Sequence, residues 1–261
     1  MFDDAALLRY SRHILLDDLG IEGQEAIARG CVLLVGAGGL GSPAALYLAA
    51  AGVGTLHLCD DDAVDLTNLQ RQVALLTSDL GRPKVDATRD RVLALNPLVQ
   101  VHVHRQRLDQ AALAALLPAV DVVLDCSDNF TTRHAVNAAC VMARVPLVSG
   151  AAIRFDGQLA VFDPRSPVSP CYACLFPQTG GADELRCAEM GVFAPLTGII
   201  GAVQAAEALK LLAGLGESLA GRLQMLDARS MRWHELRVPR DPGCPVCGSA
   251  PGCPDPSADA H

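Results

Sequence analysis

The sequence predicts an α/β protein built on a Rossmann-like, doubly wound, mostly parallel sheet that antiparallel strands extend. Two observations carry this prediction. A short apolar strand, a glycine turn and a helix follow one another at 31–51, and Val- and Leu-rich runs then alternate with helical stretches as far as residue 149. Such alternation is typical of parallel sheets with helices on both faces. Apolar residues make up 51% of the chain and aromatic residues only 4%, which predicts a core of Ala, Leu and Val.

The stretch at 31–51 also predicts a binding site. The apolar run 32–35 is followed by three glycines spaced as G-x-G-x-x-G, namely Gly36, Gly38 and Gly41. In such a turn the first glycine permits the bend, the second lets the backbone approach a phosphate, and the third lets the helix pack on the sheet. The next strand, 53–59, ends at Asp60, where an acid can bind ribose hydroxyls. We therefore predict a mononucleotide site; the alternative is a glycine turn that only packs.

The segments on either side of this unit are polar. Residues 4–19 read as one helix that Gly20 and Gly23 end, and its arginines Arg9 and Arg12 alone favour a solvated basic stripe. The segment 60–72 follows the second strand; its four carboxylates fit a solvated loop, but it also holds side chains that suit phosphate and ribose oxygens, Asn68, Arg71 and Gln72.

The run 81–84 is predicted to open a helix that ends at Leu95, with Pro83 at its first helical position. Arg82 and Lys84 then stand at its positive end, where a cation costs about 0.3–1 kcal/mol unless an anion lies opposite. Either a phosphate faces this turn, or both side chains bend into water.

The remaining strands of the parallel part are predicted at 98–103, 120–126 and 146–149, with helices at 110–117 and 131–143. Because the carboxyl ends of parallel strands share one edge, Asp128 is expected near Gly38 and Asp60, unless it only caps a helix. Beyond Gly157 we expect further strands at 158–162, 222–226 and 233–238. An apolar helix is expected at 195–212, buried in the core or between subunits.

Composition excludes several classes of protein. A net charge of -8 argues against nucleic-acid binding. The N-terminus lacks the features of a secretion signal, and the apolar stretch 192–203 is short and broken by Pro195, so we expect no membrane span and a cytoplasmic protein.

Ten cysteines then suggest metal ligands rather than disulfides. Two C-x-x-C pairs match a closed four-thiolate zinc site, Cys171, Cys174, Cys244 and Cys247. A single such pair would fit a thioredoxin-like redox couple, but two pairs favour structural zinc. Four other cysteines lie in apolar contexts and are interpreted as core residues, Cys31, Cys59, Cys126 and Cys140.

Taken together, these motifs give the chain a family resemblance. The glycine turn, Asp60 with Asp62, the run 68–72, the turn 82–84, the run 125–129 and the two cysteine pairs resemble the ThiF/MoeB/HesA adenylyltransferases, relatives of ubiquitin-activating enzymes, over about residues 5–248. The resemblance implies ATP- and magnesium-dependent adenylation of the C-terminal glycine of a ubiquitin-like sulfur carrier protein, of the molybdopterin or the thiamine type.

The resemblance also implies the roles of individual residues. The turn around Gly39 lies beside the α-phosphate, Asp60 holds the ribose, Asp128 binds magnesium, and Arg12 reaches the triphosphate of a partner subunit, which implies a homodimer. The expected catalytic residues are Arg12, Arg71, Lys84, Asp128 and Cys187. The expected nucleotide-binding residues are Gly36, Gly38, Gly39, Gly41, Asp60, Asp62, Asn68, Arg71, Gln72, Lys84, Asp128 and Asn129.

The resemblance further divides the chain and suggests partners. Residues 1–248 form one adenylation domain, made of an N-terminal helical segment (1–30), a nucleotide-binding core (31–150) and a carrier-binding and zinc part (151–248); a disordered tail follows at 249–261. Cys187 matches a cysteine that can link to the carrier during sulfur transfer; the alternative is an incidental loop cysteine. A cysteine desulfurase or another sulfur donor is then a further expected partner.

The expected reaction fits this set of residues. A C-terminal carboxylate, with a pKa of about 3.5, is ionised at neutral pH and needs no general base, so the site must mainly compensate charge. The rival hypotheses are an NAD-dependent oxidoreductase, a non-catalytic zinc scaffold that binds a ubiquitin-like protein, and a relative that adenylates peptides or tRNA bases. An NAD-dependent oxidoreductase would not explain why Arg71, Lys84 and Asp128 are expected in one crevice.

Overall fold

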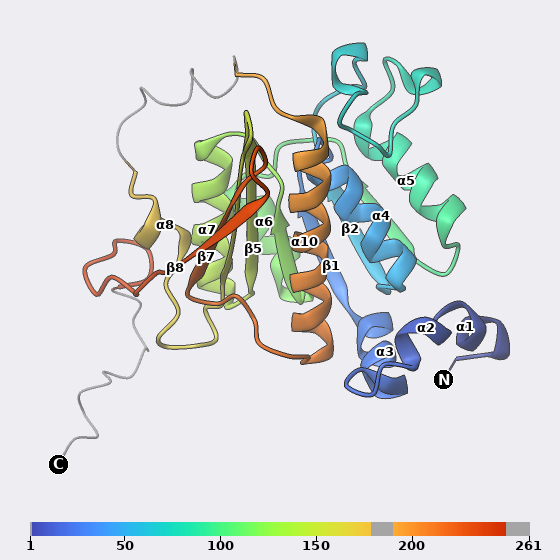
Figure 1. Cartoon of the computed structure of the whole chain (residues 1–261), viewed down its shortest axis with the longest axis horizontal. Coiled ribbons are helices and arrows are strands. Elements are labelled where there is room, and N and C mark those ends of the chain that lie inside the picture. The colour runs from blue at the N-terminus through green and yellow to red at the C-terminus, as the bar shows by residue number, and fades with distance from the viewer. Residues whose placement is uncertain (1, 179–189, 249–261) are drawn as a thin grey trace.

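The computed structural model describes residues 2–178 and 190–248. Its described strands form one eight-stranded sheet in the order β3-β2-β1-β4-β5-β6-β7-β8 (Figure 1). The strands are β1 (Cys31–Val35), β2 (Thr55–Cys59), β3 (Gln100–His104), β4 (Val122–Asp125), β5 (Leu147–Ile153), β6 (Asp156–Phe162), β7 (Arg222–Asp227) and β8 (Arg232–Arg237). The longer helices are α3 (Gly20–Arg29), α4 (Gly41–Ala51), α5 (Lys84–Leu95), α6 (Gln110–Leu116), α7 (Phe130–Ala143) and α10 (Ala194–Ala213).

The sheet changes direction at β5. Strands β3, β2, β1, β4 and β5 are parallel, whereas β5–β6, β6–β7 and β7–β8 are antiparallel pairs. The five parallel strands have the Rossmann order, with the chain reversing on either side of β1. The predicted mixed α/β class, with a mostly parallel sheet extended by antiparallel strands, is therefore confirmed.

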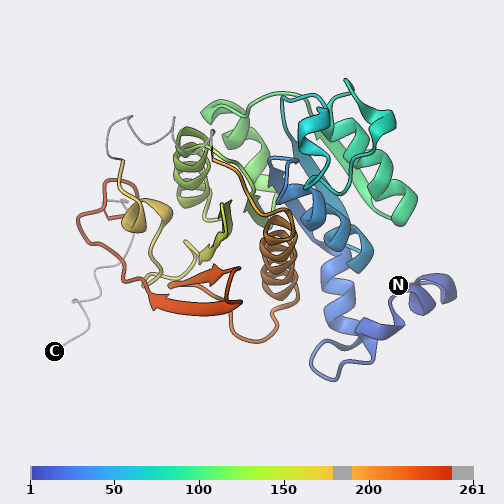
Figure 2. The same ribbon diagram turned by 45° about the horizontal axis from the view of Figure 1, so that its top comes forward.

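Helices cover both faces of the sheet (Figure 2). On one face α4, α5 and α10 pack through a cluster that includes Leu48, Val85, Leu56 and Ile200. On the other face α6 and α7 pack through a second cluster that includes Leu113 and Val136. The β1 side chains alternate between the two, so this strand is buried on both faces, as its uninterrupted apolar run predicted.

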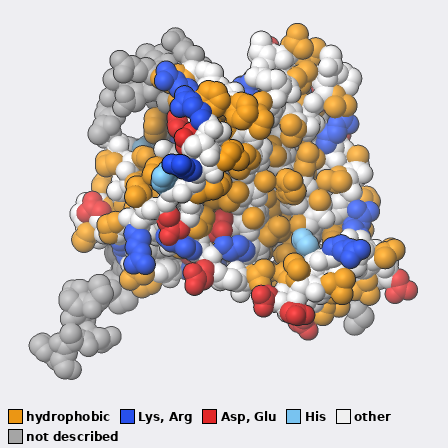
Figure 3. Space-filling model, viewed as in Figure 1, with side chains coloured by type: hydrophobic (Ala, Val, Ile, Leu, Met, Phe, Trp, Pro, Cys, Tyr) orange, Lys and Arg blue, Asp and Glu red, His pale blue; other side chains and the backbone are white. Residues whose placement is uncertain are grey.

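Helix α10 is long and apolar enough to cross a membrane by length and composition alone. In the structure it packs against α4, β5 and β6, and Leu196, Ile200 and Ala208 are fully buried. Its opposite side, with Ile199 and Val203, remains half-buried. Uncharged and hydrophobic atoms dominate the middle of the face over α10 (Figure 3).

The N-terminal helix differs from the prediction. Residues 4–19 do not form one helix: α1 (Asp4–Arg9) ends at Tyr10, and α2 (Ser11–Ile14) is short. The break follows the burial of Tyr10, whose hydroxyl accepts a 2.9 Å hydrogen bond from Asn96 Nδ2. Gly20 does not end a helix but begins α3, with a φ of 59° that glycine tolerates.

Three parts of the prediction lie outside the described residues: Cys187, most of the polar stretch 178–184, and the tail 249–261. The core interpretation of the other cysteines is confirmed for Cys59, Cys126 and Cys140, which are buried. Cys31 is only half-buried.

Candidate active site

A cavity of about 520 Å³ opens at the carboxyl ends of the parallel strands. It lies where β4 and β5 separate, between the glycine turn after β1, the loops after β2 and β4, and the inner strands β5 and β6. Nearly all of the predicted nucleotide-binding residues line it; the exception is Gly41. Those that line it are Gly36, Gly38, Gly39, Asp60, Asp62, Asn68, Arg71, Gln72, Lys84, Asp128 and Asn129.

The glycines of the turn have different tasks. Gly36 has a φ of 98°, and a Cβ there would lie 2.7 Å from the carbonyl oxygen of Cys126. A Cβ on Gly41 would lie 1.9 Å from the carbonyl oxygen of Gly36, so both positions require glycine for packing. At Gly38 a Cβ would meet only the Gln72 side chain at 3.5 Å. The backbone at Gly38 therefore faces open space, as close approach of a phosphate requires.

Asp60 is tied to this turn. Its Oδ2 accepts a 2.7 Å hydrogen bond from the Ala37 amide, and its Oδ1 accepts one of 2.8 Å from the Asp62 amide. Burial raises the pKa of Asp60, while these two amides and the charge of Lys84 oppose the rise. Each oxygen keeps a further lone pair that can accept a hydrogen bond from a hydroxyl group.

Lys84 points into the cavity, and Arg82 does not. Lys84 Nζ lies 2.6 Å from Asp62 Oδ2, and the lysine side chain is only 6% exposed. Arg82 binds Asp79 and Asp90, each at 2.6 Å, and does not line the cavity. The phosphate outcome considered for Arg82 is therefore wrong. The side chain is 42% exposed, as the water alternative expected, but two carboxylates also neutralise the cation. Lys84 also has a carboxylate partner, but one that lines the cavity with it.

Two more polar side chains from the loop after β2 reach the cavity. Arg71 Nη2 donates a 2.9 Å hydrogen bond to Asn68 Oδ1, which orients the guanidinium. Gln72 is 3% exposed, and its Oε1 has no hydrogen-bond partner among the described residues. A buried amide oxygen without a partner is costly, so Gln72 Oε1 offers a free acceptor at the cavity wall.

The loop after β4 carries the acid predicted to hold a metal ion. Asp128 is exposed within the cavity, whereas the preceding acid, Asp125, is fully buried. Asn129 caps α7, since its Oδ1 accepts a 2.9 Å hydrogen bond from the Thr132 amide. The alternative for Asp128, a helix cap, is therefore wrong, and Asn129 has this structural role in addition to lining the cavity.

Sequence reasoning missed several charged residues that line the cavity, among them Asp61, Arg107 and Arg133. Arg107 pairs with Asp61 at 3.1 Å on the wall beside Asp60. Arg133, in the first turn of α7, reaches the cavity between β4 and β5. The only signal of Arg133 in the sequence is a cation near the N-terminus of a predicted helix, the same feature that Arg82 and Lys84 show.

One predicted catalytic residue, Arg12, is not at this cavity. Arg12 is exposed on α2, on the side of the molecule away from the loops that follow β2 (Figure 1). Cys187 lies outside the described residues.

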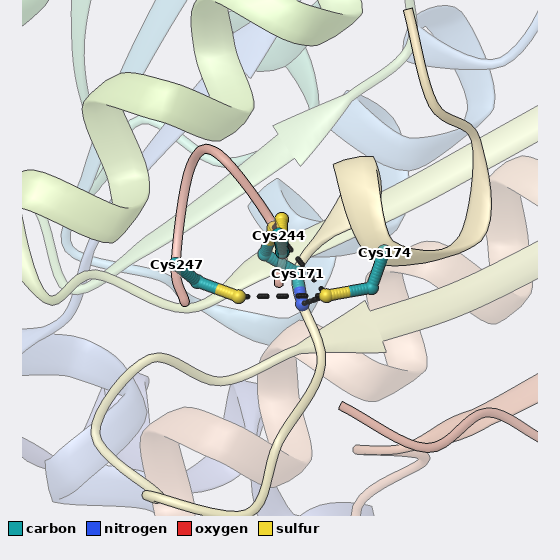
Figure 4. Close-up of side chains that lie close together, drawn as sticks. All are labelled: Cys171, Cys174, Cys244 and Cys247. Atoms are coloured by element: carbon teal, nitrogen blue, oxygen red, sulfur yellow. Dashed lines mark hydrogen bonds between the residues drawn. The ribbon is translucent and has the colours of Figure 1, made fainter. Parts of the chain in front are cut away.

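The four predicted metal ligands come together (Figure 4). Their Sγ atoms are separated by 3.7 Å for Cys171 and Cys244, 3.9 Å for Cys171 and Cys174, and 3.4 Å for Cys174 and Cys247. A tetrahedral zinc ion with bonds of about 2.3 Å requires sulfur–sulfur distances of about 3.8 Å. The thiols therefore fit a tetrahedral metal site. They join α8 (Tyr172–Leu175), which Cys171 precedes and which contains Cys174, to the C-terminal segment.

Comparisons with known proteins agree with this architecture. The profile of the ThiF family matches residues 10–246. Two Escherichia coli proteins are similar over nearly their whole length: the sulfur carrier protein ThiS adenylyltransferase, 47% identical over 95% of this chain and 98% of its own, and the molybdopterin-synthase adenylyltransferase, 48% identical over 94% and 98%. The crystal structure of E. coli MccB with ATP is 26% identical, with a TM-score of 0.81 over 92% of this chain and 75% of its own. The chain thus belongs to the ThiF family.

Proposed function

We propose that this protein is an adenylyltransferase that uses ATP to activate the C-terminal carboxylate of a ubiquitin-like sulfur carrier protein. One observation carries the proposal: Arg71, Lys84 and Asp128 line one cavity with the open backbone of Gly38 and the anchored Asp60. A nicotinamide cofactor would use Gly38 and Asp60 but not the other three. The names of the two E. coli relatives, which both act on such carriers or their synthase, support the substrate class.

The cavity residues suit ATP. Asp60 would bind the ribose hydroxyls, and the glycine turn around Gly38 would receive the α-phosphate, with the remaining phosphates between Arg71 and Lys84. Gln72 Oε1, which lacks a partner, would accept a hydrogen bond from the ribose or from water. Asp128 would hold a magnesium ion, which supplies further neutralisation of the phosphate charge.

The chemistry asks little of the protein beyond charge and position. An oxygen of the carrier's C-terminal carboxylate attacks the α-phosphorus, the new carboxyl–phosphate bond forms, and the bond to the β-phosphate oxygen breaks to release pyrophosphate. No proton is transferred, so no general base is needed. Both reactants are anions, and the cations Arg71 and Lys84 would lower the barrier by compensating the charge that develops.

The second half of the chain would receive the carrier and hold zinc. The cavity continues from the nucleotide residues past Gly150 and Ala151 of β5 to Asp156 and Gln158 of β6, which fits an extended peptide tail. We assign zinc to the four cysteines because their spacing and geometry match a closed, structural site. We assign residues 1–30, 31–150 and 151–248 to helical, nucleotide-binding and carrier-binding parts of one adenylation domain.

Arg12 supports a homodimer. Helix α2 lies toward the amino ends of the parallel strands, whereas the cavity is at their carboxyl ends (Figure 1), so a catalytic Arg12 requires a partner subunit. The half-buried apolar side of α10 and the exposed Leu8, Leu15 and Leu16 are surfaces that a second copy would cover. Cys187 and a sulfur donor such as a cysteine desulfurase stay predictions, as does a cytoplasmic location.

The experiment that tests the function is ATP–pyrophosphate exchange by the purified protein. A molybdopterin-type carrier, a thiazole-type carrier and no carrier are compared. Exchange that requires a carrier supports the proposal and identifies the branch. Nucleotide binding without exchange in any sample argues for another acyl substrate.

A further inference from the structure

Arg133 occupies a position that disfavours a cation. Its side chain is only 10% exposed, and it lies in the first turn of α7, at the positive end of the helix dipole. Removing a charged group from water is costly, and the dipole adds to the cost. Such an arginine persists only when its N–H groups are well bound, so its partners indicate what it does.

The guanidinium bridges two strands. Nη2 donates hydrogen bonds to the carbonyl oxygens of Ser127, at 2.5 Å, and Gly150, at 2.9 Å. Nη1 lies 3.5 Å from Ser149 Oγ and 3.7 Å from Asp125 Oδ2. One side chain thus connects the loop after β4 with the middle of β5.

The bridge spans the place where the sheet opens. Strands β4 and β5 pair as far as Asp125 and Ser149. Beyond this pair, β4 ends and its chain turns away toward Asp128, while β5 continues to Ile153 alongside β6. The cavity lies in this opening, and the Arg133 guanidinium connects its two walls.

The loop is also held from the other side. The buried Asp125 carboxylate accepts hydrogen bonds from the Ser127 amide at 3.1 Å and the Ser127 hydroxyl at 2.6 Å. Gln204 of α10 donates to the carbonyl oxygens of Asp125, at 2.8 Å, and Val148, at 3.2 Å. Every polar group of Ser127 is therefore bound, and the next residue is Asp128.

We propose that Arg133 is a positioning residue: it fixes Asp128 relative to β5, and so fixes the metal-holding carboxylate relative to the carrier's reacting carboxylate. The inference rests on the proposed function for the roles of Asp128 and β5. The alternative is a purely structural role, in which Arg133 only stabilises the fold. Against it, proteins in general do not need a buried ion pair for stability.

The test compares Arg133→Lys with wild type. Lysine keeps the charge, but its shorter side chain carries a single nitrogen. It cannot bind the Ser127 and Gly150 carbonyls as Nη2 does and also face Ser149 and Asp125 as Nη1 does. We expect a folded variant whose midpoint of thermal unfolding is lowered, because buried carbonyls lose a donor. Per folded protein, its kcat for exchange should be on the order of 10- to 100-fold lower, the scale of a small misplacement. The KM for ATP should stay within about twofold, because Asp60 and Gly38 on the opposite wall are untouched. The magnesium concentration for half-maximal activity should rise several-fold, because Asp128 is displaced.

Two further variants complete the design. Arg144→Lys changes an exposed arginine just beyond the last turn of the same helix and should behave as wild type. If Arg133→Lys does not fold, the double variant Asp125→Asn/Arg133→Gln removes both buried charges together, and it should show the same loss of kcat and the same magnesium shift.

The outcomes separate this inference from the proposed function. If wild type shows no exchange, the proposed function fails, and Arg133 is tested by the magnesium dependence of binding a non-hydrolysable ATP analogue, which needs no carrier. A several-fold rise in the required magnesium concentration supports positioning if it is seen in the folded Arg133 variant and not in Arg144→Lys. Wild-type kcat and magnesium dependence in that variant overturn it. Activity lost only in proportion to unfolded protein, without a magnesium shift, also overturns it, as does a wild type that binds no nucleotide.

Discussion

The Ala37 amide donates a 2.7 Å hydrogen bond to Asp60 Oδ2, so the glycine turn after β1 and the acid after β2 form one unit. The Asp62 amide binds the other oxygen at 2.8 Å, which fixes the plane of the carboxylate. The acid is therefore oriented before any nucleotide arrives. Preorganisation of this kind reduces the cost of binding.

Asp60→Asn should weaken nucleotide binding. The amide has a single acceptor oxygen, so one of the two backbone N–H groups would lose its partner and the carboxylate would lose its orientation. We expect about a 10-fold rise in the dissociation constant for ATP, measured by calorimetric titration. Asp163→Asn is the control, since Asp163 pairs with the exposed Arg165 outside the cavity, and equal effects of the two substitutions would contradict the special role of Asp60.

Lys84→Ala and Arg71→Ala should abolish adenylation while the fold stays intact. Each removes a cation from the cavity, and loss of such a group costs on the order of 100-fold or more in kcat. Arg82→Ala is the matched control: it removes a neighbouring cation that binds Asp79 and Asp90 outside the cavity. It should lower the stability slightly and leave kcat unchanged. Near-normal exchange by Lys84→Ala would refute the phosphate assignment.

Cys174→Ser should remove the metal. One thiolate of the four would be replaced by a poor zinc ligand, so the zinc content, measured by atomic absorption, should fall and the unfolding midpoint should drop. Cys140→Ser, which changes a buried cysteine outside the cluster, controls for the loss of a core thiol. A Cys174 variant with full metal content would disprove the four-thiolate site.

Arg12→Ala and Lys84→Ala should complement each other if Arg12 acts on the partner's cavity. Each variant alone is inactive. A heterodimer then holds one site with both residues intact, so an equal mixture should recover about a quarter of wild-type activity. Subunit exchange must be shown independently, by mass spectrometry of differently tagged chains. If the subunits exchange but activity is not recovered, Arg12 does not act in the partner's cavity.

Stability should depend on pH through His57. Burial, together with the neighbouring His102 and His104, lowers the pKa of His57 to about 4, and the pKa of His104 is lowered as well, mainly by burial. Between about pH 6.5 and pH 4 the unfolded chain therefore takes up protons that the folded protein does not, and the free energy of unfolding falls as the pH falls. Urea unfolding at pH 7 and pH 5 should show a smaller loss for His57→Gln than for wild type. An equal loss would show that other groups control the acid sensitivity.

Local rules account for what the sequence predicted well. The strand, turn and helix around Gly36 depend on residues next to one another, and Asp60 follows from the length of one βαβ unit. The cysteine cluster follows from the spacing within each pair. In these places neighbouring residues decide the structure.

Tertiary contacts account for what the sequence did not predict. The break at Tyr10 depends on a hydrogen bond to Asn96, which is 86 residues away. Arg133 binds carbonyl groups of two separate segments, and no side-chain pattern announces a backbone acceptor. Arg82 is different, because its partner Asp79 stands three residues before it and offered a signal.

The most direct test of the adenylyltransferase function is ATP–pyrophosphate exchange by wild type, Lys84→Ala and Arg82→Ala with each carrier. We expect exchange that depends on a carrier and on magnesium in wild type and Arg82→Ala, and none in Lys84→Ala. Absence of exchange from wild type with both carriers, while it still binds ATP, would contradict the proposed substrate. Equal exchange by all three proteins would contradict the assignment of this cavity.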